Sequence, residues 1–285
     1  MRDVGIIGAG LAGLTAAADL AAAGRRVTVF DKSRGTGGRL ATRRTDVGAF
    51  DHGAPAVHGS AAFGAAMADL GAVRRGEGWH GVPGASALVK PLERGVEVRK
   101  GVRIVEAWEG AGWHLLDAEG EVLGPFGALI CAIPAPQAAA LFPGANLSGV
   151  TMTPRWTLMA AFEEAVSPEE IPPPFEGLHH AAPHRVVAHA GPDWSAANLE
   201  RAEPEVRGEL VARLREAVGG LSPVFAAAHR WRFARVGRAL GRPVLEVSRT
   251  CWLGGDWTLG PDAGHAWESG RALARAALGK GAELS

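Results

Sequence analysis

The 285-residue sequence contains no tyrosine, only two cysteines and only four lysines among its 30 basic residues. The absence of tyrosine excludes a phenolic acid catalyst and a binding cage built from two tyrosines. The cysteines, Cys131 and Cys251, lie far apart in the sequence and predict neither a disulfide framework nor a zinc ligand set. We therefore expect a protein of the reducing cytoplasm.

An excess of either charge is also missing, because 30 basic residues balance 30 acidic ones. General binding to nucleic acid or to a membrane surface needs a cationic excess, so neither partner is expected. No apolar run reaches the roughly 18–20 residues that span a bilayer. The start, Met1-Arg2-Asp3-Val4, leads directly into a strand-like run, which predicts no signal peptide. The expected partner is a small-molecule substrate.

The N-terminal segment has the pattern of a strand, a turn, a helix and a second strand. A buried strand at Val4–Ile7 is followed by the turn Gly8-Ala9-Gly10-Leu11-Ala12-Gly13. The predicted helix, Leu11–Ala23, ends at Gly24, and the second strand, Val27–Phe30, leads to Asp31. A G-x-G-x-x-G sequence in this β-α-β setting, with an acid at this distance, is typical of dinucleotide binding.

Each glycine of this turn has its own physical role. Gly8 permits the tight turn, Gly10 lets the backbone approach a pyrophosphate, and Gly13 allows the helix to pack closely on the strand. The N–H groups at the helix start, including those of Leu11 and Ala12, carry a partial positive charge toward phosphates. We expect a bound dinucleotide; the alternative is a glycine-rich turn without a ligand.

The segment after the second strand distinguishes between dinucleotides. The carboxylate of Asp31 can accept hydrogen bonds from ribose hydroxyls, and Lys32 and Ser33 follow it. In Gly38-Arg39-Leu40, a glycine beside an arginine offers a second site for phosphate oxygens. An NAD domain does not need this second site, whereas the buried pyrophosphate of FAD does. The segment therefore favours FAD, bound non-covalently.

These motifs resemble a known family. The G-G-R segment after the acidic strand end resembles the flavin amine oxidase superfamily, and KSRGTGGRLATRR followed by FDHGAP is similar more narrowly to the renalase-like flavoproteins. Three further segments share the resemblance: Leu129–Gln137, His229–Ala234, and Gly254–Trp257 with Ala266–Gly270.

The resemblance implies an α/β fold, with a Rossmann-like FAD-binding domain and a second, smaller mixed-sheet substrate domain. The hydrophobic content of 47% is sufficient for such cores. We expect the FAD-binding domain to be discontinuous, over residues 1–55, 86–148 and 243–285, and the substrate domain to cover 56–85 and 149–242. Within the latter, apolar residues recur every four positions over Glu203–Val218, which predicts a helix.

The resemblance also implies further cofactor contacts. Ile104 would lie by the adenine, Ala132 would end a strand beside the cofactor, and Gly255 with Asp256 would meet the ribityl or pyrophosphate part. A helix starting near Ala266 and Trp267 would direct its N–H groups at the flavin ring, where a positive dipole stabilises the anionic reduced flavin. The turn Asp51-His52-Gly53-Ala54 would lie alongside the ring.

Substrate-facing candidates come from strand alternation. If His229–Ala234 is a strand, His229, Trp231 and Phe233 share one face, and Arg230 and Arg232 share the other. The aromatic face either lines a substrate pocket or belongs to the core with one hydrogen-bonded histidine. Trp156 and His52 are further candidates. Four other histidines, at 179, 180, 184 and 189, lack the spacing of metal ligands, and no metal is expected.

The resemblance implies oxidation of a small planar donor, namely dihydronicotinamide isomers. A hydride would pass to flavin N5 in a pocket between the domains, and oxygen would reoxidise the flavin. One alternative is a flavin amine oxidase, although the lack of tyrosine counts against its usual aromatic cage. Another is a non-catalytic dinucleotide-binding module.

Overall fold

The computed structural model describes residues 3–168 and 170–279, which form two compact units. Unit 1 comprises residues 1–40, 56–151 and 236–285, and unit 2 comprises residues 41–55 and 152–235. Met1 and Arg2, on which the prediction about a signal peptide partly rests, lie outside the described residues. No helix in the described ranges is long and apolar enough to cross a membrane.

Unit 1 is built on a six-stranded sheet in the order β16-β17-β11-β1-β2-β7. All neighbouring strands are parallel except β16, which runs antiparallel to β17. The strands are β1 (Val4–Ile7), β2 (Val27–Asp31), β7 (Glu97–Lys100), β11 (Ala128–Cys131), β16 (Leu245–Ser248) and β17 (Cys251–Leu253). Strands β1, β11 and β17 are buried along their whole length, as is typical of a parallel sheet covered on both faces.

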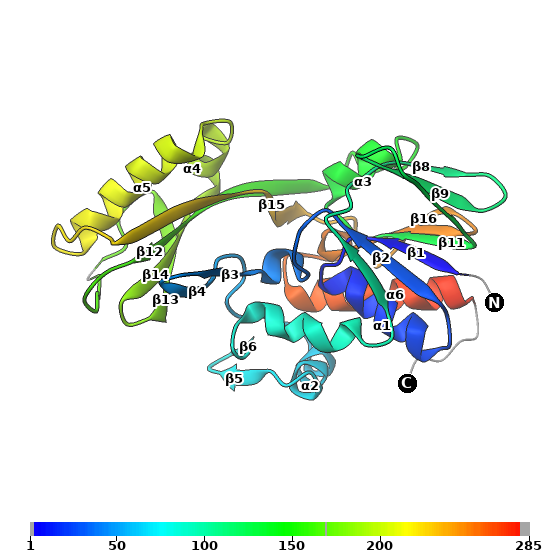
Figure 1. Ribbon diagram of the computed structural model, residues 1–285, viewed down its shortest axis with the longest axis horizontal. Coiled ribbons are helices and arrows are strands. Elements are labelled where there is room, and N and C mark those ends of the chain that lie inside the picture. The colour runs from blue at the N-terminus through cyan, green and yellow to red at the C-terminus, as the bar shows by residue number, and fades with distance from the viewer. Residues whose placement is uncertain (1–2, 169, 280–285) are drawn as a thin grey trace. The chain divides into compact units, whose positions relative to one another are not determined.

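Helices α1 (Leu11–Ala22) and α6 (Ala263–Leu278) lie side by side against this sheet (Figure 1). They approach closely because α6 has glycine at the contact: a Cβ on Gly270 would lie 2.5 Å from the carbonyl oxygen of Ala12. Arg271 of α6 pairs with Asp19 of α1 at 3.3 Å, and both side chains are mostly buried.

The rest of unit 1 consists of smaller elements. An antiparallel sheet contains β8 (Ile104–Glu109), β9 (Trp113–Asp117) and β10 (Val122–Phe126), and a hairpin contains β5 (Val73–Arg75) and β6 (Gly78–His80). The remaining helices are α2 (Ala61–Asp69), α3 (Ala135–Leu141), and the 3-10 segments η1 (Gly38–Leu40), η2 (Ala85–Glu93) and η3 (Asp256–Thr258).

Unit 2 is a four-stranded sheet in the order β13-β14-β12-β15, with helices on one face. Its elements are β3 (Thr42–Thr45), β4 (Gly48–Asp51), β12 (Thr151–Ala161), β13 (Phe175–Ala182), β14 (Arg185–Ala190), α4 (Pro192–Ala197), α5 (Glu203–Ala217) and β15 (Phe225–Arg238). The predicted helix near 203–218 is confirmed, since Val206, Leu210 and Leu214 of α5 pack into the core on this face.

The opposite face of this sheet has a different lining. Phe50 of the β3–β4 hairpin packs there with Met159, Val187 and Ala227, and Phe225 stacks on Phe50. The hairpin therefore covers part of the face that α5 does not, and the polar residues described below lie on this same face.

The predicted α/β class, with a Rossmann-like parallel sheet and a second sheet, is confirmed. The compact units have other bounds than the domains we expected. Residues 56–85 belong to unit 1 because Gly59 packs on Gly264 at the start of α6. Residues 41–55 belong to unit 2 because they form the hairpin on its sheet.

Candidate functional site

The carboxyl edge of the parallel sheet in unit 1 is the first candidate site. From β1 the chain passes through α1 to β2 and β7 on one side, whereas β11 and β17 lie on the other side of β1. The strand order therefore reverses between β1 and β11. Ligands of open α/β sheets bind outside the carboxyl ends of the strands at such a point.

The three glycines of the turn meet different surroundings. Gly8 has φ +105°, and a Cβ there would lie 2.8 Å from the carbonyl oxygen of Ala132. A Cβ on Gly13 would collide with the carbonyl oxygen of Gly8. A Cβ on Gly10, in contrast, would have no atom within 4 Å among the described residues. Packing thus explains Gly8 and Gly13, whereas Gly10 borders open space.

The start of α1 presents backbone donors beside that open space. Gly10 is the N-cap residue, and within the described residues no side chain caps the helix. The first N–H groups of a helix have no partner inside the helix and carry a partial positive charge. The predicted residues Leu11 and Ala12 occupy this first turn, and a helix start of this kind has the geometry that anions favour.

Asp31 connects the turn to the loop that follows β2. Its Oδ2 accepts a hydrogen bond from the Ala9 N–H at 2.7 Å, and its Oδ1 accepts one from the Ser33 N–H at 2.7 Å. The Val102 N–H donates to the Asp31 carbonyl at 2.9 Å, which brings the chain leading to Ile104 beside this strand end. Lys32 is exposed next to Asp31.

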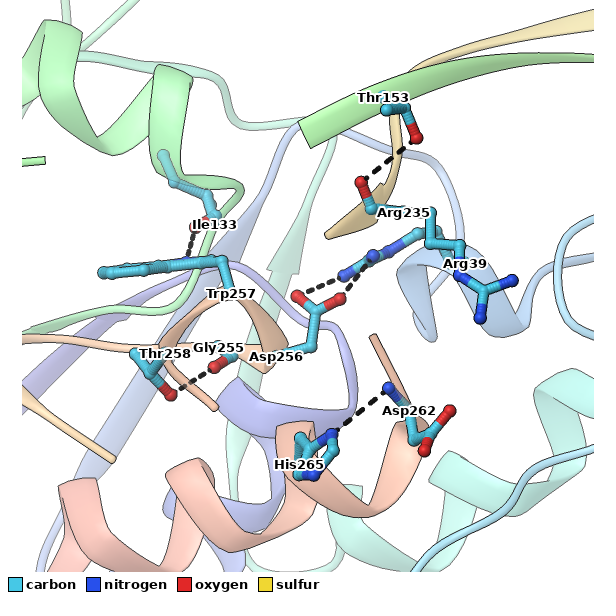
Figure 2. A network of polar contacts seen from close by, with 10 residues as sticks. All are labelled: Arg39, Ile133, Thr153, Arg235, Gly255, Asp256, Trp257, Thr258, Asp262 and His265. Carbon is cyan, nitrogen blue, oxygen red and sulfur yellow. Dashed lines mark hydrogen bonds and ion pairs between the residues drawn. The ribbon is translucent and has the colours of Figure 1, made fainter. Parts of the chain in front are cut away.

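Arg39 and Asp256 form a bidentate ion pair across 217 residues of sequence. Arg39 Nη1 and Nη2 donate to the two carboxylate oxygens of Asp256 at 2.6 and 2.7 Å (Figure 2). The Asp256 side chain is 5% exposed and that of Arg39 is 31% exposed. A Cβ on Gly38 would lie 3.5 Å from Gly10 Cα, so the pair adjoins the glycine-rich turn. Leu40 anchors η1 in the core.

The turn after β17 is held in place from several sides. Gly255 adopts φ +143°, and its N–H donates to Ser269 Oγ at 2.9 Å. The Thr258 hydroxyl donates to the Gly255 carbonyl, and Trp257 Nε1 donates to the Ile133 carbonyl at 3.0 Å (Figure 2). The last contact ties this turn to the end of β11 and Ala132. Asp256 therefore projects from a rigid turn.

The start of α6 differs from the prediction. The helix begins at Ala263 rather than near Ala266, and Asp262 and His265 form a reciprocal capping box, with the Asp262 N–H donating to His265 Nδ1 at 3.3 Å (Figure 2). A carboxylate of the chain thus already lies at the positive end of the helix. Ala266 is buried, and the Trp267 ring packs on Phe63 and under the Arg271 guanidinium.

The second candidate site lies on the sheet face of unit 2 that is opposite α5. His52, at the end of β4, is 6% exposed. Its ring centroid lies 4.9 Å from that of His229 and 5.2 Å from that of Trp231, and those two centroids are 4.3 Å apart. Trp231 Nε1 also donates to the His52 carbonyl at 3.0 Å. Three predicted residues thus form one aromatic cluster.

Strand alternation on β15 follows the prediction, because Arg230 lies on the helix-covered face, where its guanidinium packs over Trp156. The expectation that Trp156 faces a substrate is wrong. Trp156 is 1% exposed in the core beneath α5, and its Nε1 donates to the Asn198 carbonyl. The predicted flavin contacts of Asp51, Gly53 and Ala54 remain predictions; these residues lie in unit 2, where Asp51 Oδ1 accepts a hydrogen bond from Thr42.

Sequence reasoning missed two histidines of this face. The His179 and His189 rings stack at 5.6 Å, and His189 Nδ1 lies 2.9 Å from the Thr157 hydroxyl. His179 Nε2 donates to the Asp51 carbonyl at 3.2 Å. No group of three or more His, Cys, Asp or Glu in the described ranges could hold a metal ion. The pairing of His189 with Thr157 on the neighbouring strand was not available from spacing along the chain.

Burial favours the neutral forms of His52, His189 and His229. It lowers the pKa of His189 to about 3, with help from His179 and Arg155, and lowers the pKa of His229 to about 4, with help from His52 and Arg43. The pKa of His52 is lowered mainly by burial as well. The face therefore offers uncharged aromatic rings at neutral pH, with the guanidinium groups of Arg43 and Arg155 nearby.

Comparisons with known proteins extend this description. Residues 6–71 match the family described as NAD(P)-binding Rossmann-like domain. A segment of 50 residues is 46% identical to 4,4'-diapophytoene desaturase (4,4'-diaponeurosporene-forming) of Staphylococcus haemolyticus. That segment covers 18% of this chain and only 10% of the desaturase.

Solved structures are similar over nearly the whole chain. A protein assigned as a protoporphyrinogen oxidase, from Exiguobacterium sp. 255-15, has a TM-score of 0.73 at 15% identity, covering 96% of this chain and 98% of its own. A putrescine oxidase redesigned in its cofactor binding has a TM-score of 0.67 at 13% identity, covering 97% and 98%. The chain therefore has the fold of these oxidases and, at its N-terminus, a segment similar to the NAD(P)-binding Rossmann-like domain.

Proposed function

We propose that this protein is an FAD-dependent oxidoreductase of the flavin amine oxidase superfamily, with FAD held non-covalently at the carboxyl edge of the parallel sheet. The Arg39–Asp256 pair carries the proposal, because it joins the two segments whose sequences resemble flavin-binding motifs. The likeness in fold to protoporphyrinogen oxidase and putrescine oxidase supports it.

The residues at this edge fit the cofactor. Open space at Gly10, an α1 start without a side-chain cap in the described chain, and a fixed guanidinium at Arg39 are the features that a pyrophosphate requires. The residues that would hold the pyrophosphate and ribityl parts are Gly8, Gly10, Leu11, Ala12, Gly13, Gly38, Arg39, Gly255 and Asp256. Those that would hold the adenosine part are Asp31, Lys32, Ser33 and Ile104.

When bound, the flavin supplies the redox chemistry by taking a hydride at N5 from a C–H donor and passing the electrons to oxygen. The chain's own residues orient the donor and exclude water. Hydride transfer from carbon needs little acid–base help, so the neutral rings of His52 and His229 beside Trp231 are adequate. Their neutrality follows from burial, which lowers the pKa of His229 to about 4.

The sheet face of unit 2 favours a flat donor that carries negative charge. Trp231, His52 and His229 present ring faces and edges for stacking. Arg43 lies close enough to lower the pKa of His229, and Arg155 lowers that of His189, so two guanidinium groups lie near the rings, together with the carboxylates of Asp51 and Glu176. Dihydronicotinamide isomers combine a planar ring with phosphates. Their oxidation to NAD(P)⁺, with oxygen and a proton forming hydrogen peroxide, is the renalase-like activity we propose.

An anaerobic reduction screen of the FAD-bound protein tests this function. Loss of the visible flavin absorbance with dihydronicotinamide isomers, but not with amines, is the expected result. Loss with amines alone would support an amine oxidase instead, and loss with neither would support a binding module without turnover. A purified protein that neither contains nor binds flavin would contradict the cofactor itself.

The His229→Ala variant locates the donor site. We expect slower flavin reduction, because the ring that contacts both His52 and Trp231 is removed. The control is His180→Ala, an exposed histidine of β13 in the same unit. Reduction of His229→Ala at the wild-type rate would remove His229 from the site.

A further inference from the structure

The loop that joins β2 to η1 contains a buried threonine among exposed residues. Residues 32–35 are exposed, whereas Thr36 is only 4% exposed. Loops of this kind are held by few contacts, so a buried polar side chain in one requires its own partners. The partners of Thr36 come from η2.

Thr36, Lys90 and Glu93 form a closed triangle of hydrogen bonds. The Thr36 hydroxyl donates to Glu93 Oε1, Lys90 Nζ donates to Thr36 Oγ1 at 3.0 Å, and Lys90 Nζ donates to Glu93 Oε1 at 2.9 Å. Lys100, at the end of β7, lies 3.7 Å from Glu93 Oε2. Two of the four lysines in the chain therefore neutralise one carboxylate that a loop hydroxyl also contacts.

The charge balance favours an ionised Glu93. Burial acts to raise the pKa of its carboxyl, but the hydrogen bonds from Thr36 and Lys90 and the charges of Lys90 and Lys100 outweigh burial, and the pKa lies below its usual range. Hydrogen bonds to a charged group are stronger than those between neutral groups. The triangle is thus a firm attachment of the loop to η2.

The residues directly after Thr36 build the candidate cofactor site. The Gly37 N–H donates to the Ala9 carbonyl at 2.8 Å, and Gly37 pairs with Gly10 in a parallel bridge. Gly37 and Gly38 adopt φ values of +108° and +56°, which favour glycine. This backbone conformation brings the loop against Gly10. Arg39 follows at once. The position of Thr36 therefore sets the path of Gly37–Arg39.

We propose that Thr36, Glu93 and Lys90 are positioning residues for the dinucleotide: they hold Gly37–Arg39 against the glycine-rich turn without touching the cofactor. The proposal rests on FAD binding as proposed above. It predicts that breaking the triangle weakens FAD binding through the mobility of the loop.

The test compares Thr36→Val with Thr36→Ser in the full chain freed of flavin. Valine keeps the shape but removes the hydroxyl, so we expect the Kd for FAD to rise about tenfold, the loss typical of a hydrogen bond to a charged group. Serine keeps the hydroxyl and should bind FAD within about twofold of wild type. Without FAD, amide hydrogen exchange in residues 33–40 should be faster in Thr36→Val only.

Thr28→Val is the matched control. Thr28 Oγ1 donates to Glu97 Oε2 at 3.2 Å. This is also a hydrogen bond from a threonine to a glutamate, but it joins β2 to β7 and lies outside the loop. Thr28→Val should leave FAD affinity unchanged. An equal loss of FAD affinity in Thr36→Val and Thr28→Val would mean that Thr36 contributes only general stability, and it would overturn the proposal.

Lys90→Met gives a second measurement should Thr36→Val not fold, because the Lys90 side chain is 52% exposed and tolerates replacement. We expect a several-fold higher Kd. Wild-type affinity in this variant and in Thr36→Val would overturn the positioning role alone. A wild-type chain that binds no FAD would overturn the proposed function and this role together.

Discussion

At the scale of single residues, the surroundings of Gly10 and Gly13 distinguish a glycine that folding requires from one that we expect to serve binding. Gly13 is required because its missing side chain lets α1 pass the carbonyl oxygen of Gly8. Gly10 has φ −79°, which any residue adopts, and no described atom near the position of a Cβ. The proposed approach of a pyrophosphate would account for a glycine at this position. Replacing Gly13 should therefore change stability, whereas replacing Gly10 should change ligand affinity.

Gly13→Ala should destabilise the fold by about 1–3 kcal/mol, since the new methyl group overpacks the helix against the turn. Gly10→Ala should unfold like wild type but lose FAD affinity at least tenfold. Urea unfolding of the flavin-free chain and FAD titration measure the two effects. A Gly10→Ala chain with wild-type affinity would mean that no pyrophosphate approaches this backbone.

Asp256→Asn should lower both stability and FAD affinity, because it leaves the Arg39 guanidinium without its bidentate partner. We expect about 2 kcal/mol, below the range for fully buried pairs because Arg39 is partly exposed. Glu200→Gln is the matched control: its bidentate bonds to Arg232, at 2.5 and 2.8 Å, are exposed to solvent, so their loss should cost less stability than loss of the Asp256 pair. Equal costs in thermal unfolding would refute this ranking.

At the scale of elements, strand alternation gave the right pairing within β15 but could not relate one strand to another. His229 and Trp231 share a face by period alone. Trp156 is adjacent in sequence to Thr157, which faces the histidines, but its own side chain lies on the helix-covered face. His189 reaches the same face only through its register with Thr157. Such registers are tertiary information.

The start of α6 was predictable in part. Asp262 and His265 have the spacing of a capping box, a local signal that places the helix start three residues before Ala266. The resemblance instead directed attention to the Ala266–Gly270 segment. Local capping chemistry is thus a better guide to helix ends than a family motif that begins inside the helix.

The histidine face predicts a loss of stability in acid. The folded-state pKa values of His229, about 4, and His189, about 3, lie below the ordinary 6.5. Between those values the unfolded chain binds more protons, so stability should fall as the pH drops from about 6.5 toward 4 and stay level above that range. His229→Gln should show a shallower fall in urea midpoint than wild type. His180→Gln, which changes an exposed ring, should follow the wild-type curve.

At the scale of the whole molecule, the sequence was sufficient for the β-α-β unit and its acid, because strand, turn and helix signals all occur within Val4–Asp31. Arg39 and Asp256 were each linked to the cofactor, Asp256 only through the resemblance, and no local rule predicts that two residues so far apart pair with each other. The compact units could not be read from composition. Their limits depend on which sheet the β3–β4 hairpin and residues 56–85 pack against.

Binding of FAD should stabilise the whole chain by mass action. At a concentration 100 times the Kd, the gain is about 2.7 kcal/mol, which raises the thermal midpoint by several degrees. NAD⁺ and FMN at the same concentration should raise it less, since NAD⁺ lacks the flavin and FMN lacks the adenosine part of the ligand that we propose between Asp31 and Asp256. A larger shift with NAD⁺ than with FAD would assign the site to a nicotinamide cofactor.

The proposed formation of hydrogen peroxide bears on the two cysteines, because peroxide can oxidise thiolates. Cys131 and Cys251 lie on the adjacent strands β11 and β17, both buried. Burial raises the pKa of Cys131 to about 12 and raises that of Cys251 as well. Since peroxide attacks thiolates rather than thiols, neither sulfur presents a reactive target in the native fold. An oxidase built this way would be spared oxidation of these two thiols by its own product.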